Sequence, residues 1–175
     1  MTELIQLLRE EGEHETYEVA SAANVEATES AIGCSLPASF GEFVMTFSNG
    51  AYLFGVQEVS AVGRGNAQIV AIQDIDRIAR LDPGAELPFR EGGEARFGQL
   101  VPFGLDSNGN EWCFVRDGQR PDAEYAVSYF DTQGRRLYGK LAGFTEWLTI
   151  LAREQDEVIR TLYDDDIIYD ELMLG

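Results

Sequence analysis

The sequence predicts a single α+β domain in which helices from the N- and C-terminal segments pack on a mainly antiparallel sheet. Apolar residues follow helical spacing up to residue 47, short apolar or alternating segments separated by turn residues follow from residue 51, and helical spacing returns at Phe144. Helices, then strands, then a helix are typical of α+β domains and not of a parallel βαβ sheet. We expect one domain over residues 1–175, with its core at roughly 20–152 and an acidic C-terminal extension at 153–175.

Three helices are predicted before the sheet. The first covers residues 2–11, and the second covers about 24–32, with Asn24 as its N-cap and Gly33 just beyond its end. The apolar stripe of the second helix should consist of Ala27, Ala31 and Ile32. Pro37 is suited to the first turn of the third helix. The apolar stripe of that helix consists of Phe40, Phe43, Val44 and Phe47.

Six short strands are predicted, at 51–56, 58–62, 100–104, 111–115, 125–130 and 136–138. Between the second and third of them, the spacing predicts a helix over 69–81 whose inward side chains are Ile72, Ile75, Ile78 and Ala79. Residues 82–98 are rich in Pro, Gly and charge, which predicts a long loop. Asn108-Gly109 predicts a type I′ hairpin turn.

The charge balance is the outlier in the composition. Thirty-one acidic residues stand against 13 Lys and Arg, for a formal net charge of -18. Such a field repels phosphate backbones and anionic lipids, so we expect no direct binding to nucleic acid or to a membrane. It attracts basic proteins. The same charge also keeps a protein soluble, so acidity alone does not decide between binding and solubility.

The residues offer little for catalysis or for metal binding. His14 is the single histidine, and we expect it to be an ordinary surface side chain. Cys34 and Cys113 form no CxxC motif and have apolar neighbours, which predicts buried thiols in a reducing compartment. We therefore expect no cofactor and no metal. The N-terminus has no signal-peptide pattern and no apolar run is long enough to span a bilayer, so a cytoplasmic location is expected.

A family resemblance rests on several motifs in a fixed order. The motifs are Ile32–Pro37, Phe40 with Phe43, Asn49-Gly50, Asp74-Ile75, Val101–Gly104, Trp112–Phe114 and Phe144–Leu148. Their order resembles the SUKH superfamily, which includes yeast cell-wall assembly regulators and bacterial immunity proteins, over roughly residues 20–152. The resemblance implies a non-catalytic immunity protein that binds and neutralises a cognate toxin domain, often a nuclease.

The acidic residues near the two chain ends are the candidate partner-binding residues. At the C-terminal end they are Glu154, Asp156, Glu157, Asp164, Asp165 and Asp166, and at the N-terminal end Glu10, Glu11, Glu13 and Glu15. The segment 82–98 could add specificity, and partner affinity should fall with ionic strength. Two other functions stay open from the sequence: a regulatory or scaffolding module, and an enzyme with an unrecognised carboxylate site.

Overall fold

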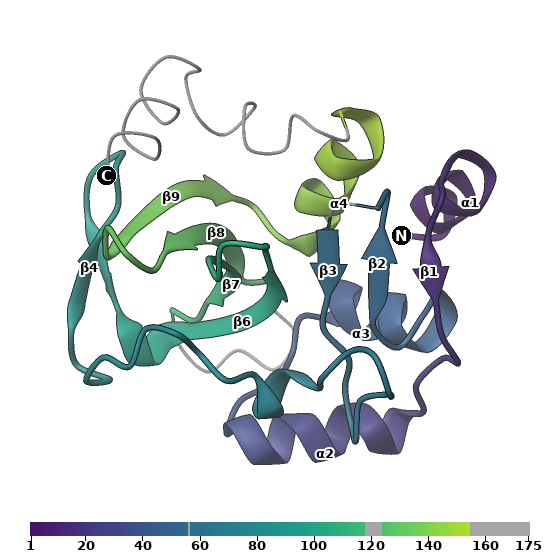
Figure 1. Cartoon of the computed structure of the whole chain (residues 1–175), viewed down its shortest axis with the longest axis horizontal. Helices are drawn as coiled ribbons and strands as arrows, with labels where there is room; N and C mark the ends of the chain where they lie inside the picture. Colours follow the sequence, from purple (N-terminus) through teal and green to yellow (C-terminus); the bar gives the residue numbers. More distant parts are fainter. Residues whose placement is uncertain (56, 118–123, 155–175) are drawn as a thin grey trace.

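A computed structural model describes residues 1–55, 57–117 and 124–154 of the chain. The helices are α1 (Thr2–Glu11), α2 (Ala22–Ile32), α3 (Ala38–Thr46) and α4 (Phe144–Glu154), with 3₁₀ turns η1 (Ile72–Asp74) and η2 (Phe97–Gln99). The strands are β1 (Glu15–Thr16), β2 (Ala51–Leu53), β3 (Gln57–Val59), β4 (Glu86–Pro88), β5 (Glu94–Arg96), β6 (Leu100–Leu105), β7 (Glu111–Val115), β8 (Ala126–Asp131) and β9 (Arg136–Leu141). This composition confirms the predicted α+β class (Figure 1).

Within the described residues the strands form three antiparallel sheets that follow one another in space. Their orders are β1-β2-β3, β6-β7-β8-β9 and β4-β5. The first sheet meets the second at β3 and β6, where the Ser60 N–H donates to the Phe103 carbonyl oxygen at 2.7 Å. The third meets the second through an isolated bridge between Phe89 and Leu137. Figure 1 shows the resulting series of strands curling from β1 to β4.

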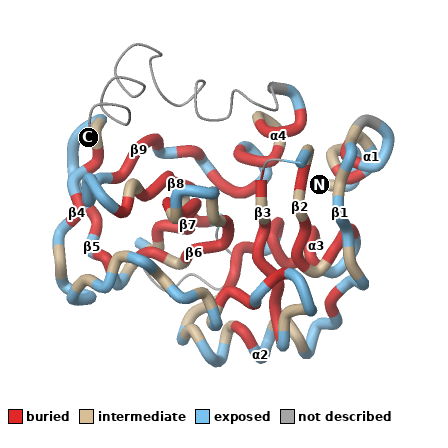
Figure 2. The backbone as a smooth tube through the Cα atoms, in the orientation of Figure 1, coloured by how far each residue is buried: buried red, intermediate tan, exposed pale blue. Residues whose placement is uncertain are grey.

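The four-stranded sheet is buried on both faces. Along β7, Trp112 and Phe114 point into the core shared with the helices, while Cys113 and Val115 point into a second core under β4 and β5. In the larger core, the rings of Phe103 and Phe114 stack with their centroids 4.3 Å apart. Figure 2 shows buried residues along the sheets and most of α3, whereas the residues of α2 other than Thr28 are exposed or half-buried.

Helix α2 begins two residues earlier than predicted and buries a different face. Ser21 is its N-cap and forms a capping box with Asn24, so the prediction of Asn24 as the N-cap is wrong. Gly33 ends the helix at φ 72°, as expected. The predicted apolar stripe is wrong for Ala27 and Ala31, which are exposed, whereas Ile32 packs against the larger core and Thr28 is the fully buried residue. Small alanines give little free energy on burial, so their spacing is a weak guide to the buried face.

The helix predicted over 69–81 is absent from the described structure, apart from the single turn η1. Arg77 would have pointed outward in that helix, but it reaches inward to the buried carboxylate of Glu111, with Nη2 and Oε2 2.6 Å apart. Ile78, predicted to be buried, is 67% exposed. Pairing a buried charge outweighs the weak helix propensity of an isoleucine-rich segment.

The long loop predicted over 82–98 is also wrong, because the segment forms the hairpin of β4 and β5. Leu87 and Ala95 are direct cross-strand partners and both are buried against the four-stranded sheet. Their alternation with exposed charged residues is the period-two pattern of a strand, which the Pro and Gly residues obscured. The turn between β6 and β7 differs too: Gly109 has φ 79°, whereas Asn108 does not have the positive φ that a type I′ turn requires.

Candidate protein-binding surface

Three of the predicted acidic residues have described side chains, and all three are exposed. Glu10 lies in the last turn of α1, Glu13 in the connection to the sheet, and Glu15 in β1. Glu11 and Glu154 lie in described helices, but their side chains fall outside the description. Asp156, Glu157, Asp164, Asp165 and Asp166 lie outside the described residues.

The sheet register aligns Glu15 with two residues that sequence reasoning missed. Glu15 pairs with Tyr52, and Tyr52 pairs with Glu58. Direct partners in an antiparallel ladder point to the same face, so these three side chains form one row across β1, β2 and β3. The neighbouring row, Ala51 and Val59, points the other way into the core. In Figure 1, α3 lies behind β2 and β3, and the row belongs to the face turned away from it.

Tyr17 adds a fourth side chain to this row. Its hydroxyl donates to Oε2 of Glu15 at 3.4 Å. Desolvation raises the pKa of Tyr17, and the charges of Glu15 and Glu58 raise it further. Partial burial also raises the pKa of Glu58. We call Glu15, Tyr17, Tyr52 and Glu58 the acidic sheet face.

The acidic sheet face has the chemistry of a site for cationic side chains. An aromatic face attracts a guanidinium or ammonium group, and a carboxylate on each side can accept its charge-assisted hydrogen bonds. Cross-strand partners have Cβ atoms about 5 Å apart, so the Cβ atoms of Glu15 and Glu58 lie about 10 Å apart on either side of Tyr52. One arginine or lysine of a partner could therefore lie over Tyr52 between two acids.

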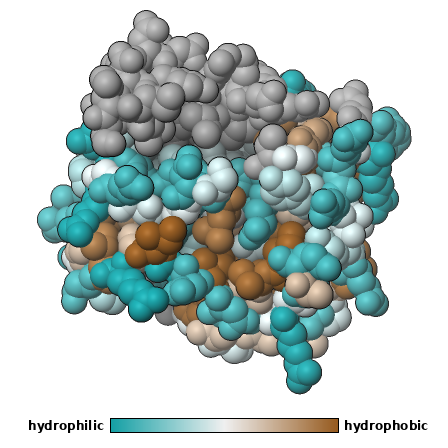
Figure 3. All heavy atoms as spheres, in the orientation of Figure 1, coloured by the Kyte–Doolittle hydropathy of each residue, from teal (hydrophilic) through white to brown (hydrophobic). Residues whose placement is uncertain are grey.

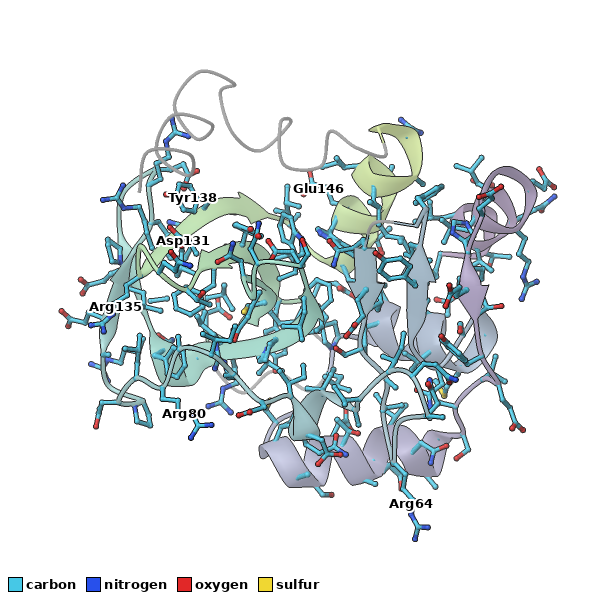
Figure 4. The ribbon with its side chains drawn as sticks, viewed as in Figure 1. Arg64, Arg80, Asp131, Arg135, Tyr138 and Glu146 are labelled. Carbon is cyan, nitrogen blue, oxygen red and sulfur yellow. The ribbon has the colours of Figure 1, made fainter. Side chains whose placement is uncertain are left out.

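A hollow of about 440 Å³ adjoins the acidic sheet face through Tyr17. Most of its polar lining is committed to the fold: Asn24 belongs to the capping box of α2, and the Asn49 side chain bonds both backbone groups of Val62. Arg64, also in the lining, points outward into solvent (Figure 4). Figure 3 shows that this face of the molecule is largely hydrophilic, with a band of hydrophobic residues reaching the surface across its middle.

His14 is not the ordinary surface side chain that was predicted. Its Nδ1 accepts the backbone N–H of Phe54 at 3.1 Å, and its Nε2 lies 2.8 Å from the carbonyl oxygen of Leu8. Burial of the ring lowers the pKa of His14, while the Leu8 carbonyl raises it. The histidine therefore connects the end of α1 to the turn between β2 and β3 and fixes where the N-terminal acids lie. Sequence spacing gave no sign of these contacts.

The two thiols differ in burial. Cys113 is fully buried, as predicted, and burial followed by the nearby charge of Glu111 raises its pKa well above the usual value. Cys34 is only half-buried, so the prediction of a buried thiol is wrong for this residue. Among the residues that the structure describes, no group of three or more His, Cys, Asp or Glu side chains could hold a metal ion. None of the described helices has the length and apolar character needed to cross a membrane.

The motif residues behind the family resemblance serve the fold. Pro37 is the N-cap residue of α3, and Trp147 is fully buried in the larger core. Gly50 has φ 80°, and a Cβ atom there would lie 3.0 Å from Cγ2 of Ile69. These roles explain why the motifs identify an architecture and leave the partner open.

Comparison with known proteins agrees with this architecture. No curated protein matches the chain. A model of the SMI1 / KNR4 family (SUKH-1) matches residues 19–150, which covers everything from the approach to α2 to the middle of α4. The chain belongs to the SMI1 / KNR4 (SUKH-1) family, and the wider superfamily includes immunity proteins.

Proposed function

We propose that this protein is a non-catalytic binding protein that captures a basic partner protein on the acidic sheet face. The observation that carries the proposal is the row of Glu15, Tyr52 and Glu58, which places an aromatic ring between two carboxylates on the outer face of a sheet. The exposed acids Glu10 and Glu13 extend the negative surface toward α1. The formal net charge of -18 would speed the approach of a basic partner.

The partner that best fits this surface and this family is a cognate toxin that acts on nucleic acid. A nuclease needs a basic face to hold phosphate backbones. An acidic immunity protein that binds there blocks the active site by charge and by bulk. The free cysteines suit a reducing compartment, so we place the encounter in the cytoplasm.

The gene of an immunity protein is expected to lie beside the gene of its toxin. The experiment is therefore to co-purify this protein with the product of the gene beside its own, and then to reverse the charges of the acidic sheet face. The double variant Glu15→Lys with Glu58→Lys should weaken binding at least about tenfold, because each reversal turns attraction into repulsion. The matched control is Glu86→Lys with Glu94→Lys on β4 and β5, where both acids are exposed and the change in net charge is the same. Equal loss of affinity in the two double variants would contradict the placement of the site.

A functional readout separates neutralisation from a regulatory or scaffolding role. A cognate toxin should arrest growth when expressed alone, and coexpression of this protein should restore growth. The Glu15→Lys and Glu58→Lys variant should lose that rescue while the control retains it. Binding without any rescue of growth would favour a regulatory or scaffolding function, in which the same surface binds a partner without neutralising it.

A further inference from the structure

His14 occupies the junction of α1, α3 and the turn between β2 and β3. Its ring meets Phe54 edge-on with centroids 4.5 Å apart and Phe47 at 5.9 Å. The carbonyl oxygen of Leu8 can only accept a hydrogen bond, so Nε2 carries the hydrogen. The N–H of Phe54 can only donate, so Nδ1 is bare. The contacts therefore require a neutral imidazole in a single tautomer.

The backbone on both sides of the ring is shaped for these contacts. Phe54 has φ 52°, a left-handed conformation that residues with a Cβ atom rarely adopt and that needs support from its surroundings. The bond to Nδ1 and the edge-on ring contact supply that support. On the other side, a Cβ atom on Gly12 would lie 1.8 Å from Nε2 of His14, so a larger residue could not stay there with the ring in place.

We propose that His14 is a pH-sensitive latch that holds Phe54, the residue after β2, against the end of α1 and releases it when Nδ1 is protonated. Protonation removes the acceptor and points an N–H at the N–H of Phe54. The bond from Nε2 to Leu8 survives, because that nitrogen donates in both states. The strained Phe54 then loses its support, so the chain at Phe54 is the part that opens.

The charged residues around the ring do not compensate its protonation. Arg9 turns to the Thr46 carbonyl at 2.7 Å, and Glu10 accepts from Gln6 at 2.8 Å. Glu15 accepts from the Tyr17 hydroxyl. The other described acids of these elements are Glu3 on α1, Glu13 just after it, Glu42 on α3 and Glu58 on β3, and the side chain of Glu11 lies outside the description. The causes that set the pKa of His14 are burial, which lowers it, and the Leu8 carbonyl, which raises it, with no side-chain charge among them.

Low pH favours the open state of the latch. The pKa of His14 in the closed state lies below the ordinary value of 6.5, so the closed state is favoured most above that value. As the pH falls from 6.5 toward the lowered pKa, the ratio of closed to open molecules drops by up to about tenfold for each pH unit. Glu13 and Glu15 flank the latch, so opening would also disturb the acidic sheet face, a consequence that rests on the proposed function.

The test is an NMR titration of the free, full-length protein, which needs no partner. Imidazole ¹⁵N shifts of His14 should show a protonated Nε2 and a bare Nδ1 at neutral pH, with a pKa below 6.5. The hydrogen-exchange protection factor of the Phe54 amide should fall with the same midpoint. An Nδ1–H tautomer, a pKa at or above 6.5, or a Phe54 protection factor that ignores this titration would overturn the latch.

Two variants complete the test. His14→Gln keeps a donor and an acceptor but cannot titrate, so Phe54 protection should become independent of pH between about 5.5 and about 7.5. His14→Phe keeps the ring contacts and loses both hydrogen bonds, so Phe54 should be unprotected across the same range. Since the chain has one histidine, a wild-type pH response that persists in both variants would also refute the proposal.

Discussion

Breaking the buried ion pair of Arg77 and Glu111 should be strongly destabilising, because it leaves one buried charge without a partner. Nε and Nη2 of Arg77 lie 2.6 to 3.1 Å from the two carboxylate oxygens, and the guanidinium carbon stands 4.0 Å from the centroid of the Phe97 ring. The Glu111 side chain is 1% exposed and the Arg77 side chain 20%. The substitution Arg77→Ala therefore leaves the buried carboxylate of Glu111 without its ion-pair partner.

The magnitude follows from that burial. Removing one partner of a buried pair costs about 3–5 kcal/mol. Because the side chain of Arg77 is partly exposed, its removal admits some water, which places the expected loss at the lower end, about 3 kcal/mol. Replacing both residues by apolar ones, Arg77→Met with Glu111→Leu, should restore most of that loss because no charge is then left unpaired.

Urea unfolding of the wild type, of Arg77→Ala and of the double variant Arg77→Met with Glu111→Leu measures these differences in the free energy of unfolding. The control is Arg80→Ala, which breaks the pair with Asp76, whose side chains are 80% and 87% exposed. Exposed pairs contribute less than about 1 kcal/mol. Figure 4 shows Arg80 pointing away from the molecule. If Arg77→Ala costs no more than Arg80→Ala, the reasoning about the segment around Arg77 is refuted.

Four further predictions concern single elements. Ser21→Ala should lower the free energy of unfolding by about 1 kcal/mol because it removes the capping box of α2, and a loss near zero in urea unfolding would contradict this. Leu87→Ala should cost about 2–5 kcal/mol, since Leu87 fills the second core, whereas a loop residue would cost little. Gly104→Ala should destabilise the junction of β3 and β6, because its Cβ atom would lie 2.9 Å from the Glu58 carbonyl oxygen; an unchanged melting temperature would argue against that contact. The free energy of unfolding should fall as the pH decreases below 6.5 in the wild type and stay flatter in His14→Gln, and parallel curves would contradict the depressed pKa of His14.

The sequence predicted those elements whose side chains pack within a short stretch of chain. The spacing of Phe40, Phe43 and Val44 predicted α3, and the strand predicted at 111–115 matches β7 at both ends. These patterns report directly on burial, which is what periodicity measures. The order of the motifs then predicted the family, because it reflects how several such elements are arranged.

The failures share a different cause, which is contact between distant residues. The helix predicted at 69–81 depended on local spacing, but Arg77 is paired with a carboxylate 34 positions away. The hairpin of β4 and β5 depends on the sheet beneath it for its burial. Local propensity is a weak prior that such tertiary contacts override.

The candidate site was predictable only in part. Composition pointed to acidic residues, and Glu15 is among those that the structure describes on an exposed strand. Its alignment with Tyr52 and Glu58 is set by strand register, which one residue of slippage would reverse. No single-sequence pattern fixes the register of a two-residue strand, so this row emerged only from the fold.

The association rate with the neighbouring gene's product tests the central claim most directly. It should be measured by stopped flow over a range of salt concentrations for the wild type, for Glu15→Lys with Glu58→Lys, and for Glu86→Lys with Glu94→Lys. We predict a wild-type rate that falls steeply with salt, and a rate at low salt that is at least about tenfold slower in the first variant than in the second. A salt-independent rate, or equal rates for the two variants, would contradict electrostatic capture on the acidic sheet face.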